Sequence, residues 1–372
     1  MPGKPFVPSE SSVRKGALPQ AQAGFTLIEL LVVTMIIGLM APLISQVISQ
    51  GLSAKERAYR EEQTQTNKQI ADAIIGWAGS AGMTTPFAGL APGRLPPPPG
   101  GGWDITAGTA NYLGLRSAIE AVVPNDQINT DGTQVGYRRA YQVLPAVGVE
   151  AFSARLWGSH GPEVALEYDV ATLWLSTCDM ANTEPACSGG RPGYSPVLSV
   201  NSAAEGYYRN YTFDLGDIGP VMLSTLPNQQ RNLRVLANQV EAIRNRLLEA
   251  FRARATRVTG DQIAANHFLP WDKSALPTAD PTLAASQNCA YAWIALDAGI
   301  GRIILGQLGF SEDRGRSPWG GTIEYCPDYN PDPAWTPADR NQAPHAAALR
   351  FNRIVTDGAP PGAPGNNVVV VF

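Results

Sequence analysis

The residues with the clearest chemical potential lie where the most apolar stretch of the chain begins. Glu29 is a carboxylate there, and residues 30–54, which follow it, include no charged side chain. An ionised carboxylate at the edge of a hydrocarbon segment is costly unless a partner neutralises it. A new α-amino group at Phe25, made by a cut after Gly24, would be such a partner on a neighbouring copy. Glu29 is therefore the residue of this stretch whose presence most needs an explanation.

Elsewhere the sequence has no motif that predicts catalysis. It lacks G-x-S-x-G, a Walker phosphate loop, H-E-x-x-H and a strand-linked G-x-G-x-x-G. Ser159 and His160 could enter a catalytic triad only through a fold that the sequence does not reveal. We therefore expect a structural protein, with no enzyme activity and no cofactor.

The apolar stretch has the length of a membrane-spanning helix. Its 25 uncharged residues extend about 37 Å at about 1.5 Å per residue, which is enough to cross a bilayer with some tilt. Three basic residues, Lys4, Arg14 and Lys15, precede it. Basic residues on one side hold that side in the cytoplasm. We expect a transmembrane segment at about 25–51 in the inner membrane, with the head that follows it in the periplasm.

Two other interpretations of this stretch fit less well. A secretory signal requires small residues at a cleavage site after the apolar run, and the nearest candidate, Leu52-Ser53-Ala54, begins with Leu. A plain membrane anchor has no use for Glu29. Cleavage before the run is favoured, because it leaves the helix on the mature protein.

These residues resemble the class III signal of type IV pilins and type II secretion pseudopilins. The resemblance identifies Gly24 as the residue before the cut, Phe25 as the N-methylated first residue and Glu29 as the fifth mature residue. Gly38 lies where many pilins have a helix glycine, and Pro42 lies one turn before the usual proline. The resemblance covers residues 24–40.

The resemblance implies an assembly function. The expected partners are a prepilin peptidase, an inner-membrane assembly platform and other pilins, which pack against the N-terminal helix. The favoured function is a minor pilin of a type IV pilus that displays a large head for tip initiation or adhesion to a surface ligand. The alternative is a minor pseudopilin whose head meets a secreted cargo. A membrane-anchored periplasmic enzyme is the least favoured hypothesis.

Charge and composition agree with an extracytoplasmic head. Removing residues 1–24 takes three basic and one acidic residue from totals of 28 and 32, which leaves a net charge of −6. An acidic chain is unlike a nucleic-acid-binding protein, so no nucleic-acid partner is expected. The chain has 37 Gly and 31 Pro, which is typical of a loop-rich domain, and its 44% hydrophobic content is ample for a packed core.

Four cysteines beyond a membrane segment suggest two disulfides formed in the periplasm. Of the three possible pairings, Cys178–Cys187 with Cys289–Cys326 is the simplest, because each pair occupies one sequence neighbourhood. Zinc is not favoured, since there is no C-x-x-C and the histidines are far away in sequence.

Two oxygen-rich loops are weak candidates for calcium. The first includes Asp126, Asn129 and Asp131, and the second includes Asp328 and Asp332. The first lacks an acid at both the first and twelfth positions that an EF-hand requires. Solvated turns are the favoured interpretation, and no metal site is predicted.

We predict an α+β protein in which a long N-terminal helix carries a large, loop-rich head of antiparallel sheets. The leader is residues 1–24 and the pilin helix is 25–82, with an apolar face at Ile70, Ala73, Ile74 and Trp77 and a stop at Gly79 and Gly82. Pro96 to Pro99 break the chain after it. Gly93 to Pro96, Gly-Arg-Leu-Pro, resembles the same region of many minor pilins.

The head is expected in two parts, 83–227 and 228–372. Strands are predicted over Arg139–Leu144, Val164–Tyr168, Thr172–Ser176, Val197–Val200, Tyr207–Phe213 and the terminal Val368–Phe372. A helix over Asn228–Val258, with Asn228 as its N-cap, opens the second part.

Ser317-Pro318-Trp319-Gly320, in the second part, resembles the Asp-Pro-Trp-Gly segment of pseudopilins, with Ser317 in place of Asp. Two pilin-like modules in tandem would explain short echoes between the two parts. The alternative is one sheet with an insertion at about 110–260.

Overall fold

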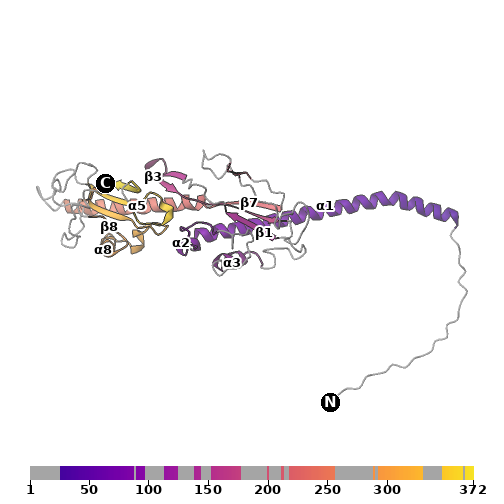
Figure 1. Cartoon of the computed structure of the whole chain (residues 1–372), viewed down its shortest axis with the longest axis horizontal. Coiled ribbons are helices and arrows are strands. Elements are labelled where there is room, and N and C mark those ends of the chain that lie inside the picture. The colour runs from indigo at the N-terminus through magenta and orange to yellow at the C-terminus, as the bar shows by residue number, and fades with distance from the viewer. Residues whose placement is uncertain are drawn as a thin grey trace, which may run out of the picture. The chain divides into compact units, whose positions relative to one another are not determined.

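The computed structural model describes most of the chain. The described residues are 26–87, 89–96, 113–124, 138–143, 152–176, 199–200, 211–212, 218–255, 288–289, 292–329, 346–362 and 365–372. They form a helical N-terminal segment and a mixed head of helices and antiparallel sheets (Figure 1). The expected α+β class is therefore correct.

Helix α1, Leu27–Gly79, is the longest element and continues through Pro42. The chain divides into two compact units within it, Met1–Tyr59 and Arg60–Phe372. The second unit contains the polar end of α1 and the whole head. A short helix, α2, Ala81–Thr84, follows at once. The helix thus ends at Gly79, the first of the two predicted stops, whereas Gly82 lies inside α2 and the predicted end at 82 was wrong.

The first module of the head consists of the C-terminal end of α1, helix α3 (Leu113–Glu120) and a three-stranded antiparallel sheet. The strands are β1, Arg138–Val143, β4, Val170–Ser176, and β7, Ile218–Ser224, in the order β1-β4-β7. Ile70 and Ile74 of α1 pack against Leu173 and Tyr141 of the sheet, and all four are buried. The apolar face predicted for α1 therefore forms the core of this module.

The second module consists of helix α5, Leu226–Ala255, helix α8, Gly299–Gln307, and a four-stranded antiparallel sheet. The strands are β8, Ile294–Ala295, β9, Glu324–Tyr329, β10, Ala346–Asn352, and β11, Asn367–Val371, paired in order along the chain. Two 3₁₀ turns, η6 (Glu312–Gly315) and η8 (Val355–Asp357), lie between strands. The apolar stripe of α5 is buried, with Leu236, Val240 and Ile243 fully enclosed.

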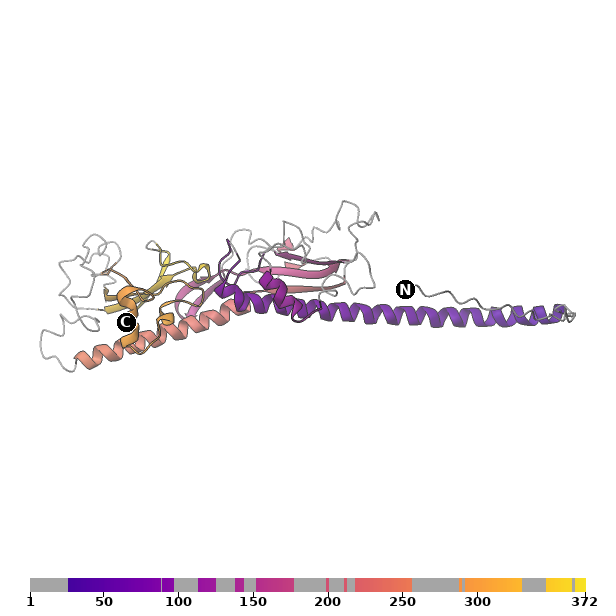
Figure 2. The same ribbon diagram turned by 90° about the horizontal axis from the view of Figure 1, so that it is seen from below.

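Each principal sheet lies against its own helix, the first against the end of α1 and the second against α5 (Figure 2). This arrangement agrees with two modules in tandem better than with one sheet carrying an insertion. A short pair, β5 (Ser199–Val200) and β6 (Tyr211–Thr212), completes the described strands.

One hairpin connects the two modules. Strands β2, Phe152–Trp157, and β3, His160–Leu166, lie between β1 and β4 in sequence. Their buried residues Leu156, Val164 and Leu166 nevertheless belong to the core of the second module. Ala165 also bridges to Ile354 beyond β10. The two parts expected from sequence are therefore interleaved in space, because this hairpin crosses the division at residue 227.

The start of α5 differs from the prediction. The helix begins at Leu226, so Asn228 lies within its first turn and the prediction of Asn228 as N-cap was wrong. Pro227 is tolerated there because the first helical N–H groups have no intrahelical acceptor. The Asn228 amide instead donates to the carbonyl of Ile75 on α1 at 3.1 Å. The Asn228 side chain therefore forms a contact between α5 and α1, where the prediction had it cap its own helix.

The expected strands overlap β1, β3, β4, β5, β6 and β11, with shifted ends. The prediction did not include β2, β7, β8 or β10. Strand β7 contains Gly219 and Pro220, which are rare in strands, and β10 begins with three alanines. Their strand conformation comes from pairing and burial, since β10 is buried along nearly its whole length.

A cluster of ionised side chains, the Arg94 cluster, fastens the loop after α2 to both modules. Arg94 donates to Asp169 at 2.9 and 2.6 Å and to Glu167 at 2.8 Å. Burial alone lowers the pKa of Arg94, but the hydrogen bonds and charges of these two carboxylates raise it above its ordinary value. Asp169 also accepts from the Leu95 backbone at 2.7 Å. Because the cluster is mostly buried, loss of one charged side chain would leave the others buried without a partner.

The backbone around these carboxylates continues the connection. Asp169 N–H donates to the Thr225 hydroxyl at 2.9 Å, directly before α5. Glu167 N–H donates to the Thr356 hydroxyl at 2.9 Å, beyond β10. The β3–β4 link therefore holds the first loop, the start of α5 and the C-terminal part in one place.

Gln229 forms a second connection between the modules. This buried side chain donates to the Gly93 carbonyl at 3.2 Å and accepts from the indole N–H of Trp319 at 2.5 Å. Gly93 itself has φ +78°, a conformation that favours glycine. Ser317 stabilises the turn that contains Trp319, because its hydroxyl accepts from Gly321 N–H at 3.1 Å. The serine at this position therefore stabilises a local turn.

Cys289 and Cys326 form a disulfide, which is the second of the two pairings expected from sequence. It joins the segment before β8 to strand β9, and both cysteines are buried beside Ala348 of β10. Next to it, the Arg350 guanidinium lies 4.3 Å from the centre of the Trp293 ring and pairs with Glu324. Cys178 and Cys187 lie outside the described residues.

We predict that Arg94→Ala destabilises the head by about 2–4 kcal/mol, because it leaves two mostly buried carboxylates without their cation. Chemical denaturation of the purified protein measures this. The matched control is Arg246→Ala on the exposed face of α5, where Arg246 pairs with Glu249 at 2.9 Å. An exposed pair contributes less than about 1 kcal/mol. Equal losses in the two variants would contradict a special role for the Arg94 cluster.

We predict that Cys289→Ala with Cys326→Ala lowers the free energy of unfolding by about 3–4 kcal/mol, since the bond closes a loop over a sequence separation of 37 residues. Wild type and the double variant should differ in unfolding midpoint when oxidised and should agree when both are reduced, because reduction also opens the expected Cys178–Cys187 bond in both proteins. A midpoint unchanged from the oxidised wild type would show that the bond adds no stability.

Candidate functional site

The first half of α1 presents an apolar surface in its unit of the structure. The large apolar side chains between Leu27 and Leu52 are 46–79% exposed, and no residue from 26 to 58 is buried. Within the described part of the chain, this is the one helix with the length and composition to cross a membrane. So much exposed apolar surface requires a lipid or protein environment.

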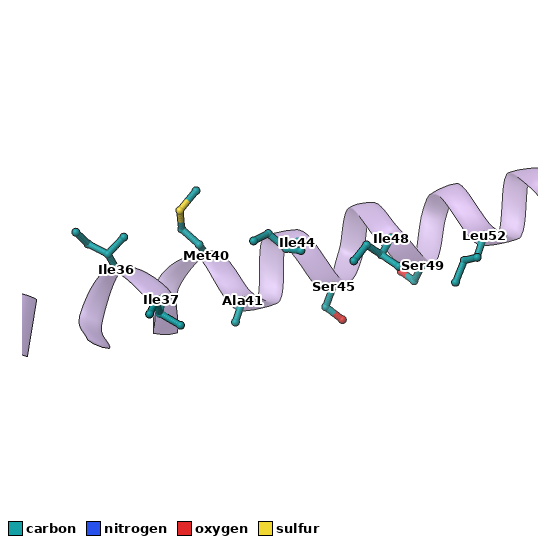
Figure 3. A pocket seen from close by; sticks show the side chains of 9 residues that line it. All are labelled: Ile36, Ile37, Met40, Ala41, Ile44, Ser45, Ile48, Ser49 and Leu52. Atoms are coloured by element: carbon teal, nitrogen blue, oxygen red, sulfur yellow. The ribbon is translucent and has the colours of Figure 1, made fainter. Parts of the chain in front are cut away.

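One face of this segment is continuous and nearly free of polar atoms, as Figure 3 shows. Its residues recur every three or four positions, which is the spacing of one helix face. They are Ile36, Ile37, Met40, Ala41, Ile44, Ser45, Ile48, Ser49 and Leu52. Only two serine hydroxyls interrupt the apolar lining, so the face suits close packing against another apolar helix.

Glu29 occupies the N-terminal end of this helix and binds Thr26. Its carboxylate accepts from the Thr26 N–H at 2.9 Å and from the Thr26 hydroxyl at 3.0 Å. The Thr26 hydroxyl in turn accepts from Glu29 N–H at 3.4 Å. This reciprocal pattern is a capping box, which satisfies N–H groups that the first helical turn leaves free. The T-x-x-E spacing is visible in the sequence, although the sequence analysis assigns Glu29 only to assembly.

The other residues singled out from sequence lie apart from this site. Gly24 and Phe25 precede the described residues. Both cysteines of the expected first disulfide, and Asp126, Asn129, Asp131 and Asp332, are also outside them, and the Asp328 side chain is not described. Among the residues that are described, no group of three His, Cys, Asp or Glu is close enough together to hold a metal ion.

Sequence reasoning missed a buried polar cluster between α1 and the first sheet. Arg139 of β1 is fully buried and donates to Gln63 at 2.6 Å and to Asn67, both on α1. Gln63 and Asn67 are themselves buried, although they lie in a polar stretch of the helix. Their four-residue spacing places them on one face with Ile70 and Ile74, which is a signal that could have identified them.

Two surface grooves lie on the described part of the head. One lies where β3 meets the corner after β10, with Glu167, Arg353 and Asp357 among its lining residues. The other lies between α1 and β7, with Lys68 and Asp72 on α1 facing Met222 of β7. His160, the histidine considered for catalysis, lies exposed at the tip of the β2–β3 hairpin, where its ring stacks on Trp157 at 6.1 Å.

Comparison with known proteins adds one finding at the N-terminus. Residues 19–41 match the family model described as the prokaryotic N-terminal methylation motif. No curated protein and no solved structure matches the chain. The match covers Gly24, Phe25 and Glu29, and it begins before the apolar half of α1. Such a motif implies processing by a prepilin peptidase and assembly with other pilins, and it points to a structural protein. The chain carries the prepilin signal of the type IV pilin and pseudopilin class.

Proposed function

We propose that this protein is a minor pilin of a type IV pilus, anchored through α1 in the inner membrane and then inserted into the fibre. The observation that carries the proposal is the methylation motif at residues 19–41, which overlaps the start of the exposed apolar half of α1. That helix has no core of its own in its unit, so its stability depends on lipid first and on neighbouring helices afterwards.

The size of the head supports a minor position. Residues 60–372 form one unit that contains two helix–sheet modules and their connections. A head of this size is large for the repeating subunit of a thin fibre, so we place it at the tip or at sparse positions. There it is available to initiate the fibre or to contact a surface ligand.

Glu29 has a role in both stages of this scheme. Before assembly, its carboxylate is held by the Thr26 capping box. After cleavage, the Phe25 amine of the adjacent subunit offers a full positive charge in the same low-dielectric region. A charge pair there attracts strongly, and removal of one partner strands the other. Glu29 therefore favours entry into the fibre when its carboxylate exchanges Thr26 for the Phe25 amine of the adjacent subunit.

A secretion pseudopilin is the second candidate. Trp319 is buried at the junction of the two modules, within the segment that resembles one in pseudopilins. Shearing of surface fibres from cells and affinity purification of an outer-membrane secretin separate the two candidates. Enrichment in the sheared fraction supports the pilus, and retention with the secretin supports the pseudopilus.

We predict that Gly24→Val leaves an uncleaved precursor in the membrane, because the peptidase requires a small residue before the cut. Membrane-extracted wild-type protein should begin at Phe25 by N-terminal sequencing. Gly38→Ala is the control, since a Cβ at Gly38 meets no other atom within 4 Å. A mature start after Ala54, or normal processing of Gly24→Val, would contradict the proposed signal.

We predict that Glu29→Ala is cleaved and membrane-inserted normally but is depleted from sheared fibres by about tenfold, since it loses the intersubunit charge pair. Glu29→Gln should fall between wild type and Glu29→Ala. The measurement is the ratio of this protein in the sheared fraction to that in the membrane fraction. An unchanged ratio for Glu29→Ala would mean that Glu29 does not drive incorporation.

A further inference from the structure

Strand β11 forms one edge of the sheet of the second module. Its pairing with β10 is regular from Asn352–Asn367 to Ala348–Val371, with no shift of register. Ala347 and Phe372 exchange two backbone hydrogen bonds at 2.8 Å each. Hydrogen-bonded and non-hydrogen-bonded pairs alternate along an antiparallel ladder. The N–H and C=O groups of Val368 and Val370 therefore face β10, and those of Val369 and Val371 face away from it.

The outward groups of β11 are unused. Within the described part of the chain, the backbone N–H and C=O of Val369 and Val371 have no hydrogen-bond partner. The Val371 side chain is 45% exposed, whereas Val370 is buried in the core. Free backbone groups on a strand edge are a template for pairing with another strand.

Two other edges of the principal sheets differ from β11. Strand β7 contains Pro220 and a register shift opposite Leu173 and Leu175, and both features disfavour further pairing. Strand β8, at the far edge of the second sheet, is only two residues long. Strand β11 has neither a proline nor a register shift, and residues 365–372 carry no charged side chain.

Part of the β11 edge lies near the β2–β3 hairpin. Ala165 of β3 donates to the Arg353 carbonyl at 2.9 Å, and Arg353 N–H donates to Asn366 at 2.8 Å, directly before β11. The hairpin thus occupies the corner where β11 begins. The outward groups of Val369 and Val371 lie further along the strand, where Val371 is exposed and Val369 is half-buried.

We propose that the β11 edge binds the same edge of a second copy of this chain. An antiparallel copy presents the same alternation of donors and acceptors, so the edge is complementary to itself. Pairing Val369 with Val371 of the other copy, and Val371 with its Val369, forms about four backbone hydrogen bonds. The edge carries no charged side chains that would repel each other. A second copy therefore suits this uncharged strand better than a charged peptide does, and the two sheets become one continuous sheet.

Hydrogen exchange of the full-length protein in detergent micelles tests this interface. The amides of Val368 and Val370 are internal controls, because they face β10 and should be protected at every protein concentration. Exchange at Val369 and Val371 should be fast in dilute protein and should slow by about tenfold or more as the dimer forms. Fast exchange at these two amides at all concentrations overturns the proposal. Protection that appears only when other pilins are added overturns the second copy as the occupant.

Two substitutions on β11 separate this interface from association through the membrane helix. Val369→Pro removes an outward N–H that β10 does not use. Val371→Lys places a charged side chain opposite Val369 of the other copy and puts the two like charges in diagonal positions across the pair. The control Val371→Thr keeps a β-branched, uncharged side chain. Light scattering should show dimers for wild type and Val371→Thr and monomers for both disruptive variants. Formation of the Cys289–Cys326 disulfide checks that each variant is folded. A dimer that persists in folded Val369→Pro and Val371→Lys contradicts the proposal.

Discussion

The connection between the two modules of the head depends on the charge-assisted hydrogen bonds of Arg94. One guanidinium binds two carboxylates of the β3–β4 link, and the backbone on either side of those carboxylates binds residues at the start of α5 and after β10. These segments are far apart in sequence. Because the carboxylates are mostly buried, the cluster is stable only when all its members are in place. It therefore couples the two modules, each of which has its own helix, sheet and apolar core.

The two modules are stabilised by the same kind of packing, although each has a different helix. In both, an apolar stripe on a helix packs against an antiparallel sheet. The helix of the first module is the C-terminal end of α1, and the other half of α1 is exposed and apolar. The helix of the second module is α5, whose outer face carries arginines and glutamates. One helix thus serves two environments along its length. This division allows the same element to enter a membrane or fibre and to begin the core of a folded head.

Polar side chains at the ends and on the faces of these helices form specific hydrogen bonds. Glu29 and Thr26 cap the first turn of α1, Gln63 and Asn67 bind a buried arginine, and Asn228 reaches the carbonyl of Ile75. Each of these side chains satisfies a group that would otherwise be costly to bury or leave unpaired. The outward backbone groups of β11 differ from these side chains, since they have no partner within the described residues.

The sequence by itself determined the N-terminal signal, the long helix with its end at Gly79, the stripe of α5 and several strands. These features depend on local periodicity, on helix-breaking residues and on the spacing of Gly24, Phe25 and Glu29, all of which are readable within one segment. The pairing of Cys289 with Cys326 was one of three possibilities, and proximity along the chain favoured it.

Only the tertiary structure decided which core each segment joins. The β2–β3 hairpin packs with the second module although it precedes β4, and alanine-rich β10 is a buried central strand because β9 and β11 flank it. Arg94 in Gly-Arg-Leu-Pro and Asn228 in the first turn of α5 acquired their partners from segments 75 and 153 residues away in sequence. Such contacts follow from burial and charge pairing across the fold, and no local propensity encodes them.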